Sequence, residues 1–129
     1  MSSVTETVDF LVVGSGAAAM AAGVRAHDLG LNVLLVEKSD RYGGSTAMSG
    51  GVCWVPNNPS MAGKGVVDSD EDALTYLRHI TGGEVADERL AGYVRESQRV
   101  LAYLEDKTHV RYDAMEKYTD LKLIWIQLD

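Results

Sequence analysis

A short stretch near the start of the chain constrains the fold more than any other feature of the sequence. Val8–Val13 is a nearly continuous apolar run rich in β-forming residues, and the glycine turn Gly14–Gly16 follows it. Ala17–Leu29 contains six alanines, the best helix formers, and Leu31–Val36 is a second apolar run. Strand, glycine turn, helix and strand within about 30 residues predict a βαβ unit. Such apolar strands are typical of a parallel sheet that is buried on both faces.

The glycine turn also has the spacing of a dinucleotide-binding fingerprint. Residues 14–19 read Gly-Ser-Gly-Ala-Ala-Ala, which fits G-x-G-x-x-G/A, and Glu37 lies 21 residues after Gly16. Gly14 permits the tight turn, and Gly16 lets a pyrophosphate approach the backbone and the positive end of the helix dipole. The Glu37 carboxylate is expected to accept hydrogen bonds from ribose hydroxyls, and it would repel the 2′-phosphate of NADP. The alternative is a glycine-rich turn with packing duties only.

Beyond this unit, the sequence predicts a long loop and two helices. Residues 38–69 hold both prolines and several glycines, and we expect them to be irregular. A helix capped by Ser69 is expected to end at Gly82, and a second helix, capped by Asp87, to reach about Asp106. The acidic outer faces of these helices are most simply solvated surface.

The tail Leu121–Leu128 has strong β character. It could add a third strand to the sheet, and without a partner strand it would be prone to aggregate.

Composition excludes several classes of protein. The chain has 129 residues, of which 46% are hydrophobic and 24% charged, so wholesale disorder is excluded. A single cysteine rules out an internal disulfide, and no apolar run approaches the length of a membrane-spanning helix. The net charge of −7 disfavours nucleic acid as a partner. The polar, acidic start lacks the positive region of a signal peptide, which favours a cytoplasmic location. The three histidines show no metal-ligand spacing, so no metal site is expected.

After Glu37 the sequence departs from an NAD-type pattern, because a glycine-rich segment stands where a helix and a third strand would usually follow. The segments VVGSGAAAMAA, VEKSDRYGGSTAMSGGVCWVPNN and YTD resemble the N-terminal FAD-binding segment of the fumarate reductase and 3-ketosteroid Δ1-dehydrogenase flavoprotein superfamily. The resemblance reaches about Asp120. It implies an α/β fold in which residues 1–120 are the N-terminal part of a Rossmann-like FAD-binding domain. Residues 121–129 are then a divergent apolar tail, and a substrate domain is absent.

The resemblance also implies a set of FAD-binding residues. The pyrophosphate would lie on the glycine turn, which is Gly14, Ser15, Gly16, Ala17 and Ala18, and on a second loop, which is Gly43, Gly44, Ser45 and Thr46. The adenosine would lie near the end of the second strand, beside Glu37 and Lys38. The flavin ring would lie near Ser49, Gly50 and Gly51. Plain loop flexibility is the alternative for the two Gly-Gly pairs. Gly44 aligns with a histidine in members with covalent flavin, so FAD is expected to be non-covalent.

For function, the resemblance implies an FAD-dependent dehydrogenase that oxidises a CH–CH bond next to a ketone in a steroid-like or other hydrophobic substrate. Tyr118 matches a segment whose tyrosine lines the steroid site in the family, and it is the one catalytic candidate; an ordinary amphipathic tyrosine is the alternative. We expect a chain of this length to be an N-terminal piece that is too short for activity alone. The alternatives are a non-catalytic FAD-binding remnant and a subunit whose sheet is completed by a partner chain.

Overall fold

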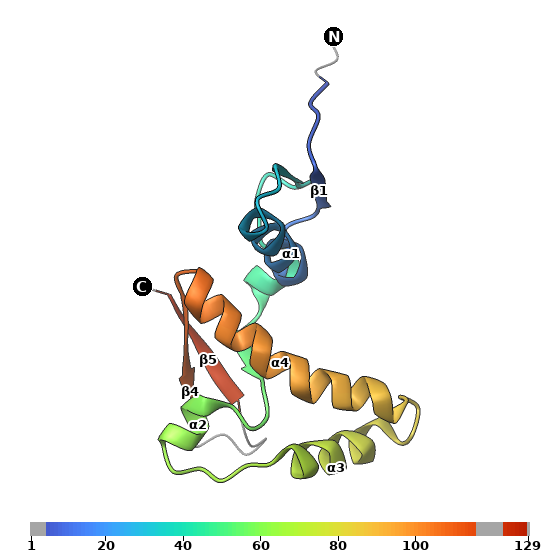
Figure 1. The fold of residues 1–129 in the computed structure, drawn as a ribbon, viewed down its shortest axis with the longest axis vertical. Helices are drawn as coiled ribbons and strands as arrows, with labels where there is room; N and C mark the ends of the chain where they lie inside the picture. Colours follow the sequence, from blue (N-terminus) through green and yellow to red (C-terminus); the bar gives the residue numbers. More distant parts are fainter. Residues whose placement is uncertain (1–4, 116–122, 129) are drawn as a thin grey trace. The chain divides into compact units, whose positions relative to one another are not determined.

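A computed structural model describes residues 5–115 and, for the backbone, residues 123–128. The chain divides into two compact units, residues 1–50 and 51–129, and the described part of each unit is treated by itself. Figure 1 shows the order of the elements along the chain.

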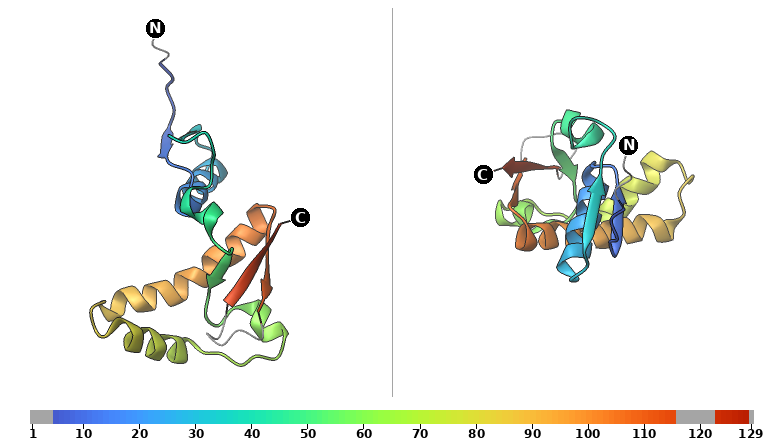
Figure 2. Two further views of the ribbon diagram at one scale, coloured as in Figure 1. Left: turned by 180° about the vertical axis from the view of Figure 1, so that it is seen from behind. Right: turned by 90° about the horizontal axis from the view of Figure 1, so that it is seen from above.

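The first unit is the predicted βαβ unit. Strand β1 (Phe10–Val13), helix α1 (Ala17–Asp28) and strand β2 (Val33–Val36) follow one another. The two strands are parallel, with a register that runs from Phe10 opposite Val33 to Val13 opposite Val36, and they lie side by side in Figure 2. Helix α1 ends where glycine was expected, since Gly30 has a φ of +84° that L side chains rarely adopt. The α/β prediction for this part of the chain is therefore confirmed.

The expectation that both faces of this sheet are buried is wrong. Val12 is 5% exposed, whereas Leu11 is 54% and Val13 78% exposed. Successive side chains of a strand point to opposite faces, and α1 covers the face that carries Val12. An added Cβ on Gly23 of α1 would lie 3.7 Å from Val12 and 3.9 Å from Val33, which marks where the helix rests on the strands. The opposite face, with Leu11 and Val13, stays open because α1 packs on one side only.

The second unit combines a helical pair with a small antiparallel sheet. Helix α3 (Asp70–Thr81) and helix α4 (Asp87–Lys107) lie alongside each other in Figures 1 and 2. Strand β3 (Val52–Trp54), strand β4 (Val110–Ala114) and strand β5 (Leu123–Leu128) form a sheet in the order β3-β5-β4. Two apolar clusters fill this unit. Their buried members are Ala73, Leu77, Leu90 and Val94 in one, and Val55, Met61, Leu101 and Ala114 in the other.

The tail is a strand, as predicted, but it does not extend the parallel sheet. Strand β5 pairs antiparallel with β3, where Cys53 lies opposite Ile124, and with β4, where Tyr112 lies opposite Ile126. The strand thus has a neighbour on each side, which removes the unpaired edges on which the aggregation argument depended. Residues 121, 122 and 129 of the predicted tail lie outside the described residues.

Residues 38–69 are more ordered than predicted. They contain a 3-10 helix η1 (Gly44–Met48), strand β3 and a short helix α2 (Pro59–Gly63). Asn58 caps α2, because its Oδ1 accepts a hydrogen bond of 3.0 Å from the Met61 amide, and proline is favoured at the first helical position. Strand β3 has only three residues and depends on a partner strand about seventy residues further along the chain.

One of the two predicted helix caps is confirmed. Ser69 Oγ accepts from the Asp72 amide at 3.1 Å, and α3 ends at Gly82 with a φ of +57°. The prediction for Asp87 is wrong, since Ala86 occupies the cap position and Asp87 is the first residue of α4. Its carboxylate instead makes a bidentate contact with Arg78, at 3.0 and 2.9 Å. Both oxygens of the Asp87 carboxylate thus accept from Arg78.

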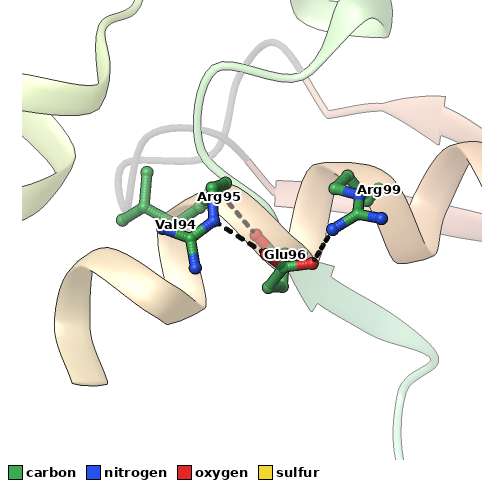
Figure 3. A network of polar contacts seen from close by, with 5 residues as sticks. Val94, Arg95, Glu96 and Arg99 are labelled. Carbon is green, nitrogen blue, oxygen red and sulfur yellow. Dashed lines mark hydrogen bonds and ion pairs between the residues drawn. The ribbon is translucent and has the colours of Figure 1, made fainter. Parts of the chain in front are cut away.

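The outer face of α4 has the ion pairs of a solvated surface. Glu96 accepts from Arg95 at 2.8 Å and from Arg99 at 2.7 Å, as Figure 3 shows. All three side chains are substantially exposed, so these pairs are worth little to stability. Within residues 5–115 and 123–128, no helix is long and apolar enough to cross a membrane.

Candidate functional site

The glycine turn joins β1 to α1 in a conformation that needs glycine. Gly14 has a φ of +97°, and its amide donates to the Val36 carbonyl at 2.7 Å, which keeps the turn against the end of β2. Gly16 is the N-cap of α1 and offers no side-chain cap. The amides of the first helical turn therefore converge on the loop, and with the helix dipole they favour an anion there.

The segment that begins at Gly43 closes on this turn from the other side. An added Cβ on Gly44 would lie 3.5 Å from the backbone of Gly16, which is ordinary van der Waals contact, so it is the φ of +54° at Gly44 that favours glycine here. Thr46 Oγ1 accepts from the Ala17 amide at 3.1 Å. One of the helix amides predicted to hold phosphate is thus already satisfied by Thr46, whose hydroxyl keeps its own proton free to donate.

Ser15 connects the turn to both neighbouring segments. It is 2% exposed, its Oγ donates to Glu37 Oε2 at 2.5 Å, and it accepts from the Gly43 amide at 2.9 Å. Sequence reasoning assigned Ser15 to the pyrophosphate alone and missed this bridge. The carboxyl ends of paired parallel strands meet at one edge of the sheet. A hydroxyl in the turn after β1 and a carboxylate after β2 could therefore have predicted a hydrogen bond between Ser15 and Glu37.

Glu37 is held in its ionised form, because its pKa is lowered from the usual value. The hydrogen bond from Ser15 is the main cause of its lowered pKa, and the Ser39 amide, which donates to Oε1 at 3.0 Å, lowers the pKa further. A carboxylate has about four acceptor positions on its two oxygens, and the hydrogen bonds from Ser15 and Ser39 occupy two of them.

A pocket of about 380 Å³ lies at the carboxyl ends of β1 and β2. Its lining combines apolar and charged side chains: Val13, Gly14, Val36, Glu37 and Lys38. Ligands of open α/β sheets bind at this end of the strands. Val13 and Val36 supply the apolar part of this lining, and Glu37 and Lys38 supply charged groups.

The structure brings together most of the predicted site residues within the first unit. The glycine turn, the end of β2 and the segment 43–46 meet around Ser15, as described above. Ser45 is exposed in η1, and Ser49 Oγ donates to the Thr46 carbonyl at 2.8 Å, which places Ser49 at the end of η1. Gly51, with a φ of +71°, begins the second unit. Tyr118 lies outside the described residues.

Packing and burial account for two further residues that could take part in chemistry, Trp54 and Cys53. Trp54 stacks on Tyr93, with ring centroids 5.9 Å apart and an interplanar angle of 7°, so packing accounts for this tryptophan. Burial raises the pKa of Cys53, which keeps it a thiol. Among the described residues, no group of three or more His, Cys, Asp or Glu side chains could hold a metal ion.

These features define a Rossmann-like dinucleotide-binding protein. The particular family follows from comparison with known proteins, because a family model described as "FAD binding domain" matches residues 9–123. The chain belongs to this family, which confirms the expected superfamily and its cofactor, FAD.

Relatives and solved structures agree with this assignment. A 3-oxosteroid 1-dehydrogenase from Mycobacterium tuberculosis (strain H37Rv) is 42% identical over 118 residues. That match covers 92% of this chain and 19% of the relative, so the chain spans about a fifth of the relative's length. The crystal structure of a 3-ketosteroid Δ1-dehydrogenase from Sterolibacterium denitrificans superposes with a TM-score of 0.84 at 42% identity, over 95% of this chain and 24% of the other. A flavocytochrome c3 fumarate reductase shares the fold, with a TM-score of 0.79 at 23% identity over 95% and 22% of the two chains.

Proposed function

We propose that residues 1–50 hold the ADP half of a non-covalent FAD. The observation that supports this most directly is the convergence of the glycine turn, the end of β2 and the segment 43–46 on one another. The pyrophosphate would bind the amides at the start of α1 and the hydroxyl of Thr46, with Ser45 beside it. Glu37 would bind the ribose, and Lys38 would line the adenosine pocket.

The residues present fit this cofactor. Gly14 and Gly44 have φ values of +97° and +54°, and neither has a side chain that would occupy phosphate space. Gly44 is also the position at which the resemblance puts a histidine in covalent members, so this chain offers no such attachment. Ser49, Gly50 and Gly51 are proposed to run near the flavin ring.

For the whole protein, we propose a dehydrogenase that acts on a CH–CH bond next to a ketone. Bound FAD would supply the hydride acceptor. The proposal for a steroid-like or other hydrophobic ketone rests on the names of the 3-ketosteroid dehydrogenase relatives. Tyr118 stays the candidate for proton exchange, and a cytoplasmic setting stays part of the proposal.

A second candidate is a binding module that needs further polypeptide to work. The open sheet face of the first unit favours it, because Leu11 and Val13 are 54% and 78% exposed and apolar. A partner chain that supplies further strands would cover this face. Activity of the isolated chain with a ketosteroid and an artificial electron acceptor would contradict this candidate.

The test of cofactor binding is the visible absorption spectrum of the purified chain after incubation with FAD and gel filtration. We expect a retained flavin band, and its absence from a folded wild-type chain would contradict the proposal. Gly16→Val should abolish it, because the side chain would occupy pyrophosphate space. A Cβ on Gly16 meets only Thr46 Oγ1 at 3.8 Å, so the apo fold should survive. Gly92→Val in α4, where an added Cβ meets no atom within 4 Å, is the matched control.

A further inference from the structure

Ser15 is one of two buried polar or charged residues in the described part of the chain, and it is the one in the first unit. Its hydroxyl has one proton to donate and two positions to accept. The proton goes to Glu37 Oε2, at 2.5 Å, and one acceptor position takes the Gly43 amide, at 2.9 Å. Burial of a hydroxyl is costly without partners, and here both partners come from other segments of the same unit.

These partners are the two segments that would contact different parts of the dinucleotide. Glu37 directly follows β2 and lines the pocket proposed for the adenosine, and Gly43 leads into the segment proposed to contact the pyrophosphate. Ser15 itself lies in the glycine turn between them. One hydroxyl therefore ties the ribose contact, the glycine turn and the second phosphate loop together before any ligand is bound. Such preorganisation removes part of the ordering cost of binding.

We propose that Ser15 is a positioning residue of the dinucleotide site, whose hydroxyl holds the Glu37 carboxylate and the Gly43 amide in fixed positions relative to each other. The ribose and pyrophosphate contacts of the dinucleotide therefore depend on each other. This inference rests on the proposed function. The tilt of the Glu37 carboxylate is fixed at both oxygens, by Ser15 at Oε2 and by the Ser39 amide at Oε1. Ser15 is the partner that also reaches the second loop.

The experiment uses Ser15→Ala, Glu37→Gln and the double variant, with Ser97→Ala as the matched control. Ser97 lies in α4, where its Oγ donates to the Val94 carbonyl at 3.2 Å, so the control removes a hydroxyl from the other unit. FAD affinity is measured by flavin fluorescence. Each single variant should weaken binding about tenfold, and the double variant little more than the stronger single one. Unchanged affinity in Ser15→Ala, or about hundredfold weakening in the double variant, would overturn the inference.

Two readouts on the chain without FAD separate positioning from a general loss of structure. In Ser15→Ala, the pKa of Glu37 should rise toward its usual value, because the hydrogen bond that lowers it most is gone. In Glu37→Gln, the amide resonance of Gly43 should shift, although Gly43 contacts Ser15 and not Glu37. The second readout stays decisive if Ser15→Ala fails to fold. A Gly43 amide that does not respond to Glu37→Gln would refute the bridge.

The failure of this inference and of the proposed function can be told apart. If the Gly43 amide responds to Glu37→Gln but the wild-type chain binds no FAD, the proposed function is overturned, and with it the role of Ser15 toward a cofactor. A wild-type chain that binds FAD, alongside a Ser15→Ala variant that binds it equally well, would overturn only the role of Ser15.

Discussion

The two units of this chain are stabilised in different ways. The second unit has closed apolar clusters, in which Ala73 is 0%, Met61 2% and Val94 2% exposed. In the first unit, Leu11 and Val13 are largely exposed, and Ser15 links the loops through hydrogen bonds. The candidate cofactor site lies in the first unit. The conformation of the loops at this site is thus determined by a few polar contacts and by glycine conformations, whereas apolar burial stabilises the second unit.

The largest effect is expected from the core of the second unit. Met61→Ala should lower the free energy of unfolding by about 2–5 kcal/mol, because it leaves a cavity in a closed cluster. Both tryptophans, Trp54 and Trp125, lie in this unit, so tryptophan fluorescence in a denaturant titration reports on it.

Leu11→Ala is the control from the open sheet face. We expect a change within about 0.5 kcal/mol, because an exposed side chain loses little on truncation. A large loss here, measured by circular dichroism, would contradict the difference between the units and would mean that the face with Leu11 is covered in solution.

The next effect concerns the glycine conformations of the first unit. Gly43 has a φ of +107°, and an added Cβ would lie 2.6 Å from the Cβ of Ala47. Gly43→Ala should therefore cost about 1–3 kcal/mol of local strain and reduce FAD retention on gel filtration. Gly65→Ala in the second unit separates the two causes, since Gly65 has a φ of +77° and an added Cβ there meets nothing within 4 Å. If Gly43→Ala and Gly65→Ala lose equal stability, backbone strain alone accounts for the cost of Gly43→Ala, and the contact with Ala47 adds nothing.

The smallest effect is the pH dependence of Glu37. Its pKa lies below the usual value of 4.5 in the folded protein. The ionised carboxylate therefore stabilises the fold above 4.5, and this contribution is lost as the pH falls through the lowered pKa. Wild-type chain and Glu37→Gln should differ in melting temperature at pH 7 and converge in acid. A constant difference across this range would mean that the charge of Glu37 plays no part.

Local sequence signals account for the fold predictions that the structure confirms. The βαβ unit, the Gly30 helix stop and the Ser69 cap each depend on residues within a few positions of one another or on a short periodic pattern. For the site, the glycine turn and Glu37 could be paired through the spacing of the dinucleotide fingerprint, in which an acidic residue follows the turn by about 20 residues. The prediction for Asp87 failed because α4 begins one residue earlier than expected, with Ala86 as its cap, and the Asp87 carboxylate contacts Arg78 of another helix.

The sequence by itself determined that a dinucleotide-type turn precedes an alanine-rich helix, because strand and helix periodicity and glycine conformations are local properties of the chain. Only the tertiary structure decided which strands pair. Strand β3 is three residues long, and its partner, where Val52 lies opposite Trp125, comes from the far end of the chain. It alone also decided that Ser15 bridges Glu37 and Gly43, because a side-chain hydrogen bond between segments 22 and 28 residues apart leaves no periodic trace in the sequence.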